Sequence, residues 1–404
     1  MGDRVLTLNA GSSSVKFALF APAATWPRMV ATGQIEGIGA EPFFHARVVD
    51  GESGEGAAKA ADHEAAIGII LDWIENAFPE NLIGAIGHRV VHGGLTYTAP
   101  TIIDDGMLSD LRALAPLAPL HQPHNLAGID AARAAFPHVP QVACFDTAFH
   151  RGHSFVHDAY ALPRKYYDQG LRRFGFHGLS YEYIARRMRE IDPVLACGRM
   201  IVAHLGNGAS LCAMHDGRSV ASTMGFSALD GLPMGTRCGQ IDPGLLIYLL
   251  AHEKMPVDDL THLLYEQSGL KGLSGASQDM RALEAAPARE AREAIAYYIN
   301  RIRMEIGDLT AALSGLDGLV FTAGIGEHSA LVRAGVVEHM QWLGLELDPQ
   351  ANLKNAERIS NDGGTPILVV PTDEETMIAD HTMTVAGLAL TTARVGALQA
   401  PPNA

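Results

Sequence analysis

Lysine is scarce in this sequence, which contains only six among 404 residues. Lysines and arginines together number 30 against 45 aspartates and glutamates, and the formal net charge is −15. Nucleic acids and anionic membranes are bound by basic surfaces, so this balance argues against both as partners. We expect an anionic substrate to be bound instead by a few locally placed cations and by metal ions.

Cysteines and long apolar runs are also few. The four cysteines lie far apart, form no C-x-x-C pair, and are Cys144, Cys197, Cys212 and Cys238. This spacing indicates neither a disulfide framework nor a thiolate zinc site. No stretch approaches the roughly twenty apolar residues of a membrane span, and the N-terminal MGDRVLTLNA lacks the basic and apolar segments of an export signal. We therefore expect a soluble protein of the reducing cytoplasm.

Several familiar catalytic motifs are absent. The chain has no Gly-Lys dipeptide, so the P-loop pattern G-x-x-x-x-G-K-[ST] does not occur and any ATP site must belong to another class. Neither H-E-x-x-H nor G-x-S-x-G is present, which disfavours a zinc peptidase and a serine hydrolase. A zinc site built from closely spaced histidines stays open as an alternative, and the pairs are His88/His92, His121/His124 and His150/His153.

The length exceeds the size at which a single core usually stops growing, so two domains are expected. Strand-like and helix-like segments alternate, which indicates an α/β architecture. Leu6 to Val15 (LTLNAGSSSV) and Val202 to Leu211 (VAHLGNGASL) share an apolar run, a small polar turn and a second apolar run, about 195 residues apart. This repeat suggests a duplicated domain, with a boundary near residue 150.

Local patterns predict individual elements. Val5 to Leu8 and Val15 to Phe20 are predicted strands joined by a tight turn. Gly51 to Glu64 is rich in Gly, Ala and charge and is predicted to be a surface loop that leads into a helix over Ala65 to Ala77. Apolar residues at helical spacing predict a long amphipathic helix over Ala286 to Leu313.

Two repeated turns, Gly11 to Ser14 and His204 to Gly208, suit phosphate binding because small residues let backbone N–H groups approach an anion. Either could equally be an ordinary hairpin turn. A third glycine turn, at Gly324 and Gly326, follows an apolar run and precedes a helical pattern over Ala330 to His339. A helix N-terminus in this context can receive a nucleotide, although the glycines could serve only close packing.

Charged residues stand at the ends of apolar runs. Arg89 lies within GHRVVHGG and Arg237 within LPMGTRCGQIDP. A planar guanidinium grips a carboxylate or phosphate at two points, but such an arginine can also form only a structural ion pair. Asp146 and the acids Asp373 to Glu375 each follow an apolar run. They could cap helices or supply the one or two carboxylates of a Mg²⁺ site.

Taken together, the motifs resemble those of the acetate kinase family over most of the chain, from about residue 5 to 390. The segments that carry the resemblance are LNAGSSSVKF, GHRVVHGG, APLAPLHQPHN, FDTAFH, FGFHGLS, HLGNGAS, MGFSALDGLPMGTRCGQIDPG, LSGASQDMR, FTAGIGEHS and PTDEETMIA. The resemblance implies two duplicated actin-like, ribonuclease H-like domains that flank a nucleotide cleft. The first would comprise residues 1–150 with 376–404, and the second, which would bind the nucleotide and dimerise, residues 151–375.

The same resemblance implies an activity, its cofactors and its partners. The reaction would be a reversible transfer of the ATP γ-phosphoryl group to acetate, giving acetyl phosphate and ADP, with Mg²⁺ (or Mn²⁺), in a cytoplasmic homodimer. The implied catalytic residues are Asp146, His177 and Arg237, and the implied metal residues are Asn9 and Glu374. Because an ionised carboxylate is already a nucleophile, we interpret Asp146 as positioning Mg²⁺ or its water more than as a general base.

The implied binding residues fall into two sets. The acetate set contains Arg89 for the carboxylate and a methyl pocket of Val91, Leu120, Phe176 and Ala228. The nucleotide set contains Ser12, Ser14, Lys16, His204, Leu205, Gly206, Asn207, Gly208, Asp279, Met280, Arg281, Gly324, Ile325, Gly326, Glu327 and His328.

Some positions depart from the family pattern. Ala228 stands where proline is usual, and the smaller residue would enlarge the methyl pocket. One methylene is worth only about 1 to 3 kcal/mol of discrimination. A propionate- or butyrate-preferring kinase of the same fold is therefore an alternative. His328 replaces the usual Asn, which bears on nucleotide preference, and the other departures are Gln122, Leu179, Tyr181 and Gln240. An ATP-switched binding protein of the actin or Hsp70 kind is the alternative from another class.

Overall fold

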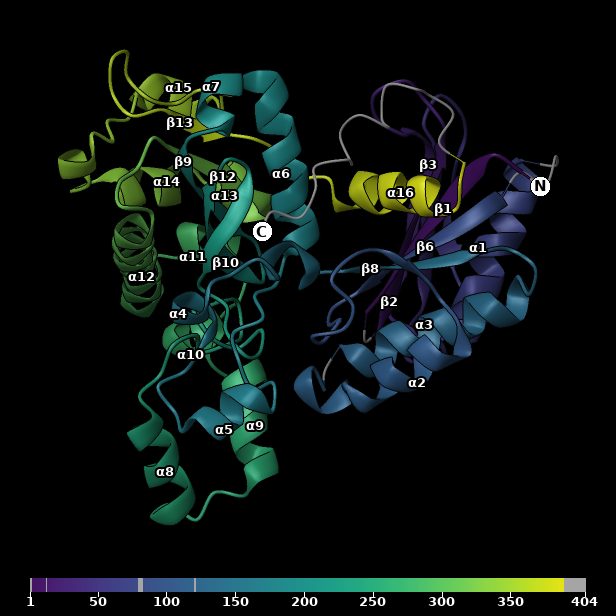
Figure 1. The fold of residues 1–404 in the computed structure, drawn as a ribbon, viewed down its shortest axis with the longest axis horizontal. Helices are drawn as coiled ribbons and strands as arrows, with labels where there is room; N and C mark the ends of the chain where they lie inside the picture. Colours follow the sequence, from purple (N-terminus) through teal and green to yellow (C-terminus); the bar gives the residue numbers. More distant parts are fainter. Residues whose placement is uncertain (1, 12, 79–82, 120, 389–404) are drawn as a thin grey trace. The chain divides into compact units, whose positions relative to one another are not determined.

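The computed structural model describes residues 2–11, 13–78, 83–119 and 121–388 and divides into two compact units (Figure 1). The first unit comprises Met1–Ala148 and the segment that begins at Asp373, and the second comprises Phe149–Thr372. Within the described residues, no helix combines the length and the apolar character that crossing a membrane requires.

The first unit is built on an eight-stranded sheet in the order β5-β4-β3-β2-β1-β6-β8-β7. β1 pairs antiparallel with β2 and parallel with β6, and β6 pairs parallel with β8. The strands are β1 (Arg4–Ala10), β2 (Ser14–Ala21), β3 (Arg28–Glu36), β4 (Phe43–Val48), β5 (Ser53–Ala57), β6 (Ile83–Val90), β7 (Thr101–Ile102) and β8 (Gln141–Phe145).

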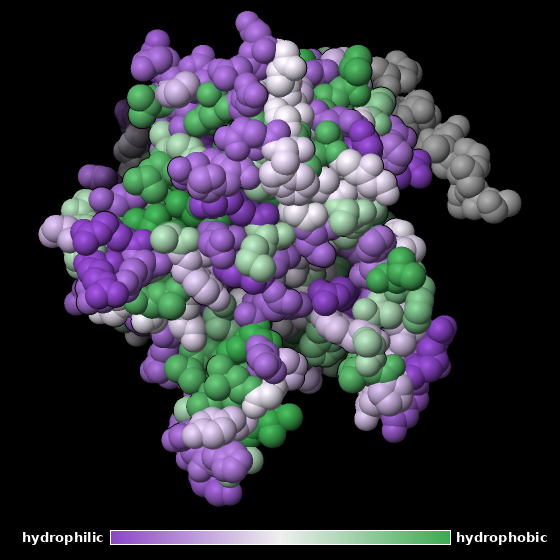
Figure 2. All heavy atoms as spheres, turned by 90° about the vertical axis from the view of Figure 1, so that its left-hand side faces the viewer, coloured by the Kyte–Doolittle hydropathy of each residue, from purple (hydrophilic) through white to green (hydrophobic). Residues whose placement is uncertain are grey.

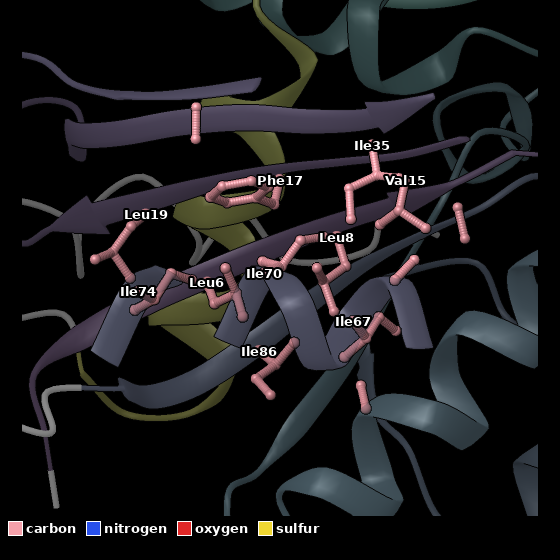
Figure 3. Packing of buried hydrophobic residues seen from close by; sticks show 14 of the residues in the cluster. Leu6, Leu8, Val15, Phe17, Leu19, Ile35, Ile67, Ile70, Ile74 and Ile86 are labelled. Carbon is pink, nitrogen blue, oxygen red and sulfur yellow. The ribbon is translucent and has the colours of Figure 1, made fainter. Parts of the chain in front are cut away.

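Side-chain alternation along β1 explains how helices cover this sheet. Leu6 and Leu8 pack with Ile67 and Ile70 of α1 (His63–Ala77), as Figure 3 shows, whereas Val5 packs with Ala379 of α16 (Glu374–Val385). Because successive residues of a strand point to opposite faces, β1 is buried by helices from both ends of the chain. The other helices of this unit are α2 (Asp105–Ala113), η1 (Ala115–Leu117) and α3 (Gln122–Ala135), and η2 (Ala148–His150) lies at the boundary.

The second unit is built on a five-stranded sheet in the order β11-β10-β9-β12-β13. Its strands are β9 (Arg199–Leu205), β10 (Ala209–His215), β11 (Arg218–Ser222), β12 (Gly318–Thr322) and β13 (Ile367–Val369). Its helices are α4 (Phe155–Asp158), α5 (Arg164–Asp168), α6 (Gly178–Ile191), α7 (Pro193–Ala196), α8 (Pro243–Ala251), α9 (Val257–Glu266), α10 (Gly269–Ser274), α11 (Met280–Ala285), α12 (Arg289–Leu313), α13 (Ala323–His328), α14 (Ala330–Val337), η3 (Gln341–Leu343) and α15 (Pro349–Leu353).

Both sheets share one pattern of strand directions, and this bears on the predicted duplication. The orders β3-β2-β1-β6-β8 and β11-β10-β9-β12-β13 each contain two antiparallel pairings followed by two parallel ones. The predicted α/β class is confirmed, and the two repeated turns lie between the first two strands of each unit, β1 and β2 or β9 and β10.

Two local predictions were wrong. Residues 51–64 are not all loop, because Ser53–Ala57 forms β5 and α1 begins at His63. Among the described residues, β5 pairs with β4, and its residues are exposed or only partly buried. Its sequence, SGEGA, therefore lacks the alternating apolar residues from which a strand is predicted. Gly324 and Gly326 do not form a turn either, because they lie inside α13, which begins directly after β12. The predicted long helix is α12, which begins three residues later than expected and ends at the expected Leu313.

Candidate functional site

In the first unit, an arginine and two acids meet where strands end. Arg89 is the penultimate residue of β6, Asp146 directly follows the neighbouring β8, and Glu374 is the first residue of α16. Arg89 donates two hydrogen bonds to Asp146, from Nε to Oδ1 at 3.1 Å and from NH2 to Oδ2 at 2.7 Å. Its Nε also lies 3.7 Å from Glu374 Oε2. This fork-to-carboxylate geometry holds the guanidinium plane in one orientation.

Burial and charge act against each other at this cluster. Desolvation disfavours the charge of Arg89, but attraction to Asp146 and Glu374 outweighs it, so the pKa of the guanidinium is raised above its usual range. The side chain of Asp146 is 2% exposed, whereas those of Arg89 and Glu374 are 22% and 18% exposed, so the arginine and the glutamate both remain partly accessible. Beside them, burial raises the pKa of Glu375 to about 7, although its hydrogen bond from Thr7 counteracts the rise.

The hairpin between β1 and β2 is tied to the end of β6 by a single amide side chain. Asn125 of α3 donates from Nδ2 to the backbone oxygen of Ala10 at 2.8 Å and accepts from the backbone N–H of Val91 at 3.0 Å. Asn9 pairs with Lys16 across the hairpin, and the Gly11 N–H donates to the Ser14 oxygen at 2.8 Å. Of the residues expected at this end, Ser12 and Leu120 lie outside the described residues.

In the second unit, the side chains of His177 and Arg237 converge on the turn that follows β9. A Cβ built on Gly208 would stand 3.2 Å from His177 Nε2 and 3.6 Å from Arg237 NH2. The loop that carries Arg237 is fixed to the same turn, because the Gly235 N–H donates to the Asn207 oxygen at 3.0 Å. A glycine at 208 therefore leaves space into which both nitrogens point.

The peptide that carries Phe176 and His177 is held by a buried histidine. His150 Nε2 donates to the Phe176 oxygen at 2.9 Å, and burial lowers the pKa of His150 to about 4, so this ring is neutral. His177 itself has a left-handed backbone with φ 57°, directly before α6. Few non-glycine residues adopt this conformation, and those that do are often found at functional sites.

Arg237 also reaches the loop expected to form the methyl pocket. Its NH1 donates to the backbone oxygen of Ala228 at 2.8 Å. Phe176 is buried and Ala228 is partly exposed in this unit, while Val91 is buried in the first unit.

A pocket of about 460 Å³ in the second unit begins at the same glycine turn. Eight residues of the expected nucleotide set line it, namely Gly206, Asn207, Asp279, Met280, Arg281, Gly324, Ile325 and His328. Asp279 caps α11 and pairs with Arg281 at 2.7 Å. Five of the expected residues do not line it: His204 and Leu205 are in β9, Gly208 faces His177, Gly326 is buried in α13, and Glu327 accepts from the Thr372 N–H at 3.2 Å.

Three lining residues were missed from the sequence: Gln278, Glu284 and Ser329. Gln278 and Ser329 lie inside the quoted motifs LSGASQDMR and FTAGIGEHS, so the motifs themselves could have found them. Glu284 lies one helical turn after Met280 on α11, and Ser329 donates to its Oε1 at 2.5 Å. Helical spacing was the signal that could have found Glu284.

The donor set decides which metal the residues fit. Among the described residues, no group of three or more His, Cys, Asp and Glu could hold a metal ion. The closely spaced histidines have other contacts: His88 bonds Gln141, His92 accepts from the Gly94 N–H, and His150 and His153 both contact Ser219. Asp146 and Glu374 offer oxygen atoms, which suit a magnesium ion that takes one or two carboxylates and otherwise phosphates and waters.

A family model, a related sequence and two solved structures each match nearly the whole of this chain, and all describe acetate or propionate kinases. The model of the acetokinase family matches residues 4–380. An acetate kinase of Methylocella silvestris is 56% identical over 400 residues, covering 95% of this chain and 98% of its own. The solved propionate kinase of Francisella tularensis is 35% identical with a TM-score of 0.90, covering 95% of this chain and 100% of its own. The solved acetate kinase of Porphyromonas gingivalis is 36% identical with a TM-score of 0.85, covering 95% and 99%.

Proposed function

The chain belongs to the acetokinase family, and we propose that it transfers the γ-phosphoryl group of ATP to acetate, reversibly, giving acetyl phosphate and ADP. It is a phosphotransferase with the duplicated actin-like α/β fold. The observation that carries the proposal is the convergence of His177 Nε2 and Arg237 NH2 at Gly208, on the turn that also borders the 460 Å³ pocket. A nucleotide in that pocket would direct its terminal phosphate towards two nitrogen donors.

The second unit is proposed to bind the nucleotide. Its pocket has the size of an ordinary small-molecule site, and the exposed Asn207 and the partly exposed Gly206 line the end nearest His177 and Arg237. Arg237 and His177 would stabilise the charge on the transferring group, since fixed donors aimed at developing charge are usually the largest catalytic contribution. His328 and Arg281 line the base and ribose side in this proposal.

The first unit is proposed to bind the acceptor. Arg89 grips the acetate carboxylate, and Asp146, whose two oxygens accept from it, holds the guanidinium in place. Val91, the described residue of the expected methyl pocket in this unit, would contact the methyl group. The bound carboxylate is ionised and attacks directly, so no residue has to remove a proton from it. In-line transfer then requires only that carboxylate and phosphoryl group be aligned and their repulsion reduced.

Magnesium fits the oxygen donors of the first unit. Glu374 and Asn9 would hold it, with Asp146 orienting the ion or a bound water, while Ser12, Ser14 and Lys16 would face the phosphates. When bound, Mg²⁺ neutralises charge on the phosphate oxygens of the nucleotide.

We further propose a homodimer in the cytoplasm, formed through an apolar face of the second unit. Hydrophobic residues gather there over the part that contains α8 (Figure 2), with Ile247 65% and Val257 67% exposed. Leu245, Leu273 and Tyr297 line one hollow on this face. Such a face is usually covered, and a second copy is the simplest partner. Sedimentation should show a dimer for the wild type and a monomer for Ile247→Glu.

A hydroxamate assay tests the function, because hydroxylamine traps acyl phosphates. We expect product with acetate, ATP and Mg²⁺, and a panel of acetate, propionate and butyrate, each with ATP or GTP, ranks the substrates. Higher kcat/KM with propionate or butyrate would favour the longer-chain kinase. ATP hydrolysis that ignores added carboxylate would refute the proposal and favour an ATP-switched binding protein.

A further inference from the structure

Two histidines beside the glycine turn of the second unit are each held by a serine. His177 Nδ1 lies 2.8 Å from Ser210 Oγ, and His204 Nδ1 lies 2.8 Å from Ser180 Oγ. The imidazole rings are stacked, with centroids 4.2 Å apart and planes inclined by 19°. All four residues are buried, so these hydrogen bonds are shielded from exchange with bulk water.

The strands of the second sheet create this arrangement. Ser210 of β10 and His204 of β9 are directly opposite in the antiparallel register. His204 is two residues from Val202 on β9, and Ser210 is two residues from Cys212 on β10, so each pair points to the same face of the sheet. Val202 and Cys212 pack with α6 in the core of this unit, and His204 and Ser210 therefore face the helix that begins directly after His177. Sheet register and helix start together bring the serine to the histidine.

Tyr181 extends the hydrogen-bonded chain. Its hydroxyl lies 2.5 Å from Ser210 Oγ, and the residue is fully buried in the first turn of α6. The rings of His150 and His204 meet it edge-on, with centroids at 5.6 and 6.3 Å. The phenol is thus fixed in place, and it stands at one of the positions where this chain departs from the family pattern.

The direction of the hydrogen bonds from Tyr181 through Ser210 to His177 decides which nitrogen of the His177 ring carries the proton. A serine hydroxyl carries one hydrogen, and phenol is the stronger acid and the better donor. When Tyr181 donates to Ser210, the serine hydrogen is directed at His177 Nδ1, which then carries none. The proton of the neutral ring is consequently on Nε2, the nitrogen that points to the space beside Gly208.

We propose that Tyr181, acting through Ser210, is a positioning residue that holds His177 as its Nε2–H tautomer and aims that N–H at the transferring phosphoryl group. This inference rests on the proposed function, because it requires a phosphoryl group at the turn. The opposite order, with Nδ1–H donating to Ser210, would point a lone pair at an anion and repel it. The stacking of His204 on His177 also disfavours protonation of both rings, since two cationic imidazoles at this distance repel each other.

Nitrogen NMR of the wild-type protein with ¹⁵N-labelled histidine tests the tautomer without any activity measurement. His177 is identified by the signal that disappears in His177→Asn. We expect a neutral ring protonated on Nε2 at pH 8, and a shift towards Nδ1–H in Tyr181→Phe. A wild-type ring protonated on Nδ1 would overturn the proposal.

Kinetics then test the consequence. Tyr181→Phe should lower kcat about 10-fold with KM for acetate and ATP within about twofold, as is typical when the partner that orients a functional histidine is lost. Ser210→Ala should lower kcat at least as much, and Ser210→Thr, which keeps the hydroxyl, should restore most of it. Unchanged kcat in both Tyr181→Phe and Ser210→Ala would contradict the proposal.

Tyr298→Phe is the matched control, because Tyr298 is fully buried in the same unit and its hydroxyl has no hydrogen-bond partner among the residues that the structure describes. It should keep wild-type kcat. If Tyr298→Phe lowered kcat as much as Tyr181→Phe does, Tyr181 would have a structural role only and the inference would be overturned. The same conclusion would follow if Tyr181→Phe also changed the KM for acetate, the KM for ATP and the Tm. Absence of acyl phosphate with the wild type would instead refute the proposed function, whereas the NMR result would still report on the tautomer.

Discussion

The two units carry different side chains on two sheets that share one pattern of strand directions. In the first, Arg89 is the penultimate residue of β6 and the next strand, β8, leads into Asp146, so charged side chains lie at the strand ends. In the second, the corresponding β12 leads directly into α13, where Gly324 and Ile325 line a pocket. The comparison teaches that the same strand pattern can end in a charged cluster in one unit and in a pocket in the other, because the side chains and the chain path after the strands differ.

The comparison is tested most strongly by removing one arginine from each unit. Arg89→Ala should raise the KM for acetate and lower kcat/KM by about 1,000-fold or more, while nucleotide affinity stays near wild type, because the two-point grip of a partly buried guanidinium is lost. Arg237→Ala should lower kcat by about 1,000-fold with smaller effects on acetate KM. Steady-state kinetics and nucleotide titration measure both.

Arg112→Ala is the control for both substitutions. Its guanidinium pairs with Asp130 on the surface of the first unit, where both side chains are about half exposed. Surface pairs of this kind contribute little, so activity should be unchanged. If Arg89→Ala weakened ATP binding as much as acetate binding, the division of roles between the units would be wrong.

This division could be predicted only in part from the sequence. The hairpins, α12 and the residue types at the strand ends follow from apolar period and turn composition. The pairing of Arg89 with Asp146 could not, because the two residues are 57 positions apart and the sequence offers the acid two other uses, as a helix cap or as a metal ligand. β5 was missed because its residues pair through the backbone and bury almost nothing, and α13 because glycines usually indicate turns.

A second prediction compares one buried histidine from each unit. Burial lowers the pKa of both His88 and His150 to about 4. A histidine whose folded pKa is lowered stabilises the fold while neutral, and this stability is lost as pH falls from about 6.5 towards 4. Lowering the pH from 7.5 to 5 should therefore reduce the unfolding free energy by about 2 kcal/mol for each of these two histidines.

Denaturant unfolding at the two pH values provides the measurement. His88→Gln and His150→Gln should each flatten the pH dependence by about that amount, although both variants are expected to be less stable at pH 7.5. His138→Gln, at a site that is exposed in the first unit, should leave the slope unchanged. A wild-type unfolding free energy that is constant over this range would show that neither ring is held neutral.

A third prediction concerns the space beside Gly208. Its Cβ would stand 3.2 Å from His177 Nε2, so Gly208→Ala should displace the histidine by a few tenths of an ångström, whereas Arg237, at 3.6 Å, would be in ordinary contact. Such misplacement should lower kcat about 10-fold while the Tm changes little. Gly152→Ala, at a position with nothing within 4 Å of the added carbon, is the control that should keep full activity. Wild-type kcat in Gly208→Ala would show that His177 and Arg237 do not act at this point.

The smallest predicted effect is on stability and compares one helical glycine from each unit. Replacement by alanine should change the unfolding free energy in opposite directions at the two positions. Gly307 of α12 has nothing within 4 Å of an added Cβ, so Gly307→Ala should raise the unfolding free energy by about 0.5 to 1 kcal/mol through helix propensity. Gly128 of α3 lies against β1, where an added Cβ would stand 2.7 Å from that of Ala10, so Gly128→Ala should instead destabilise by at least about 1 kcal/mol. Because Asn125 of the same helix binds the Ala10 oxygen, the second variant should also raise the KM for acetate or ATP, whereas Gly307→Ala should not. Paired denaturation and kinetic measurements decide it, and stabilisation by both substitutions would mean that α3 does not pack against the β1 hairpin as closely as the structure shows.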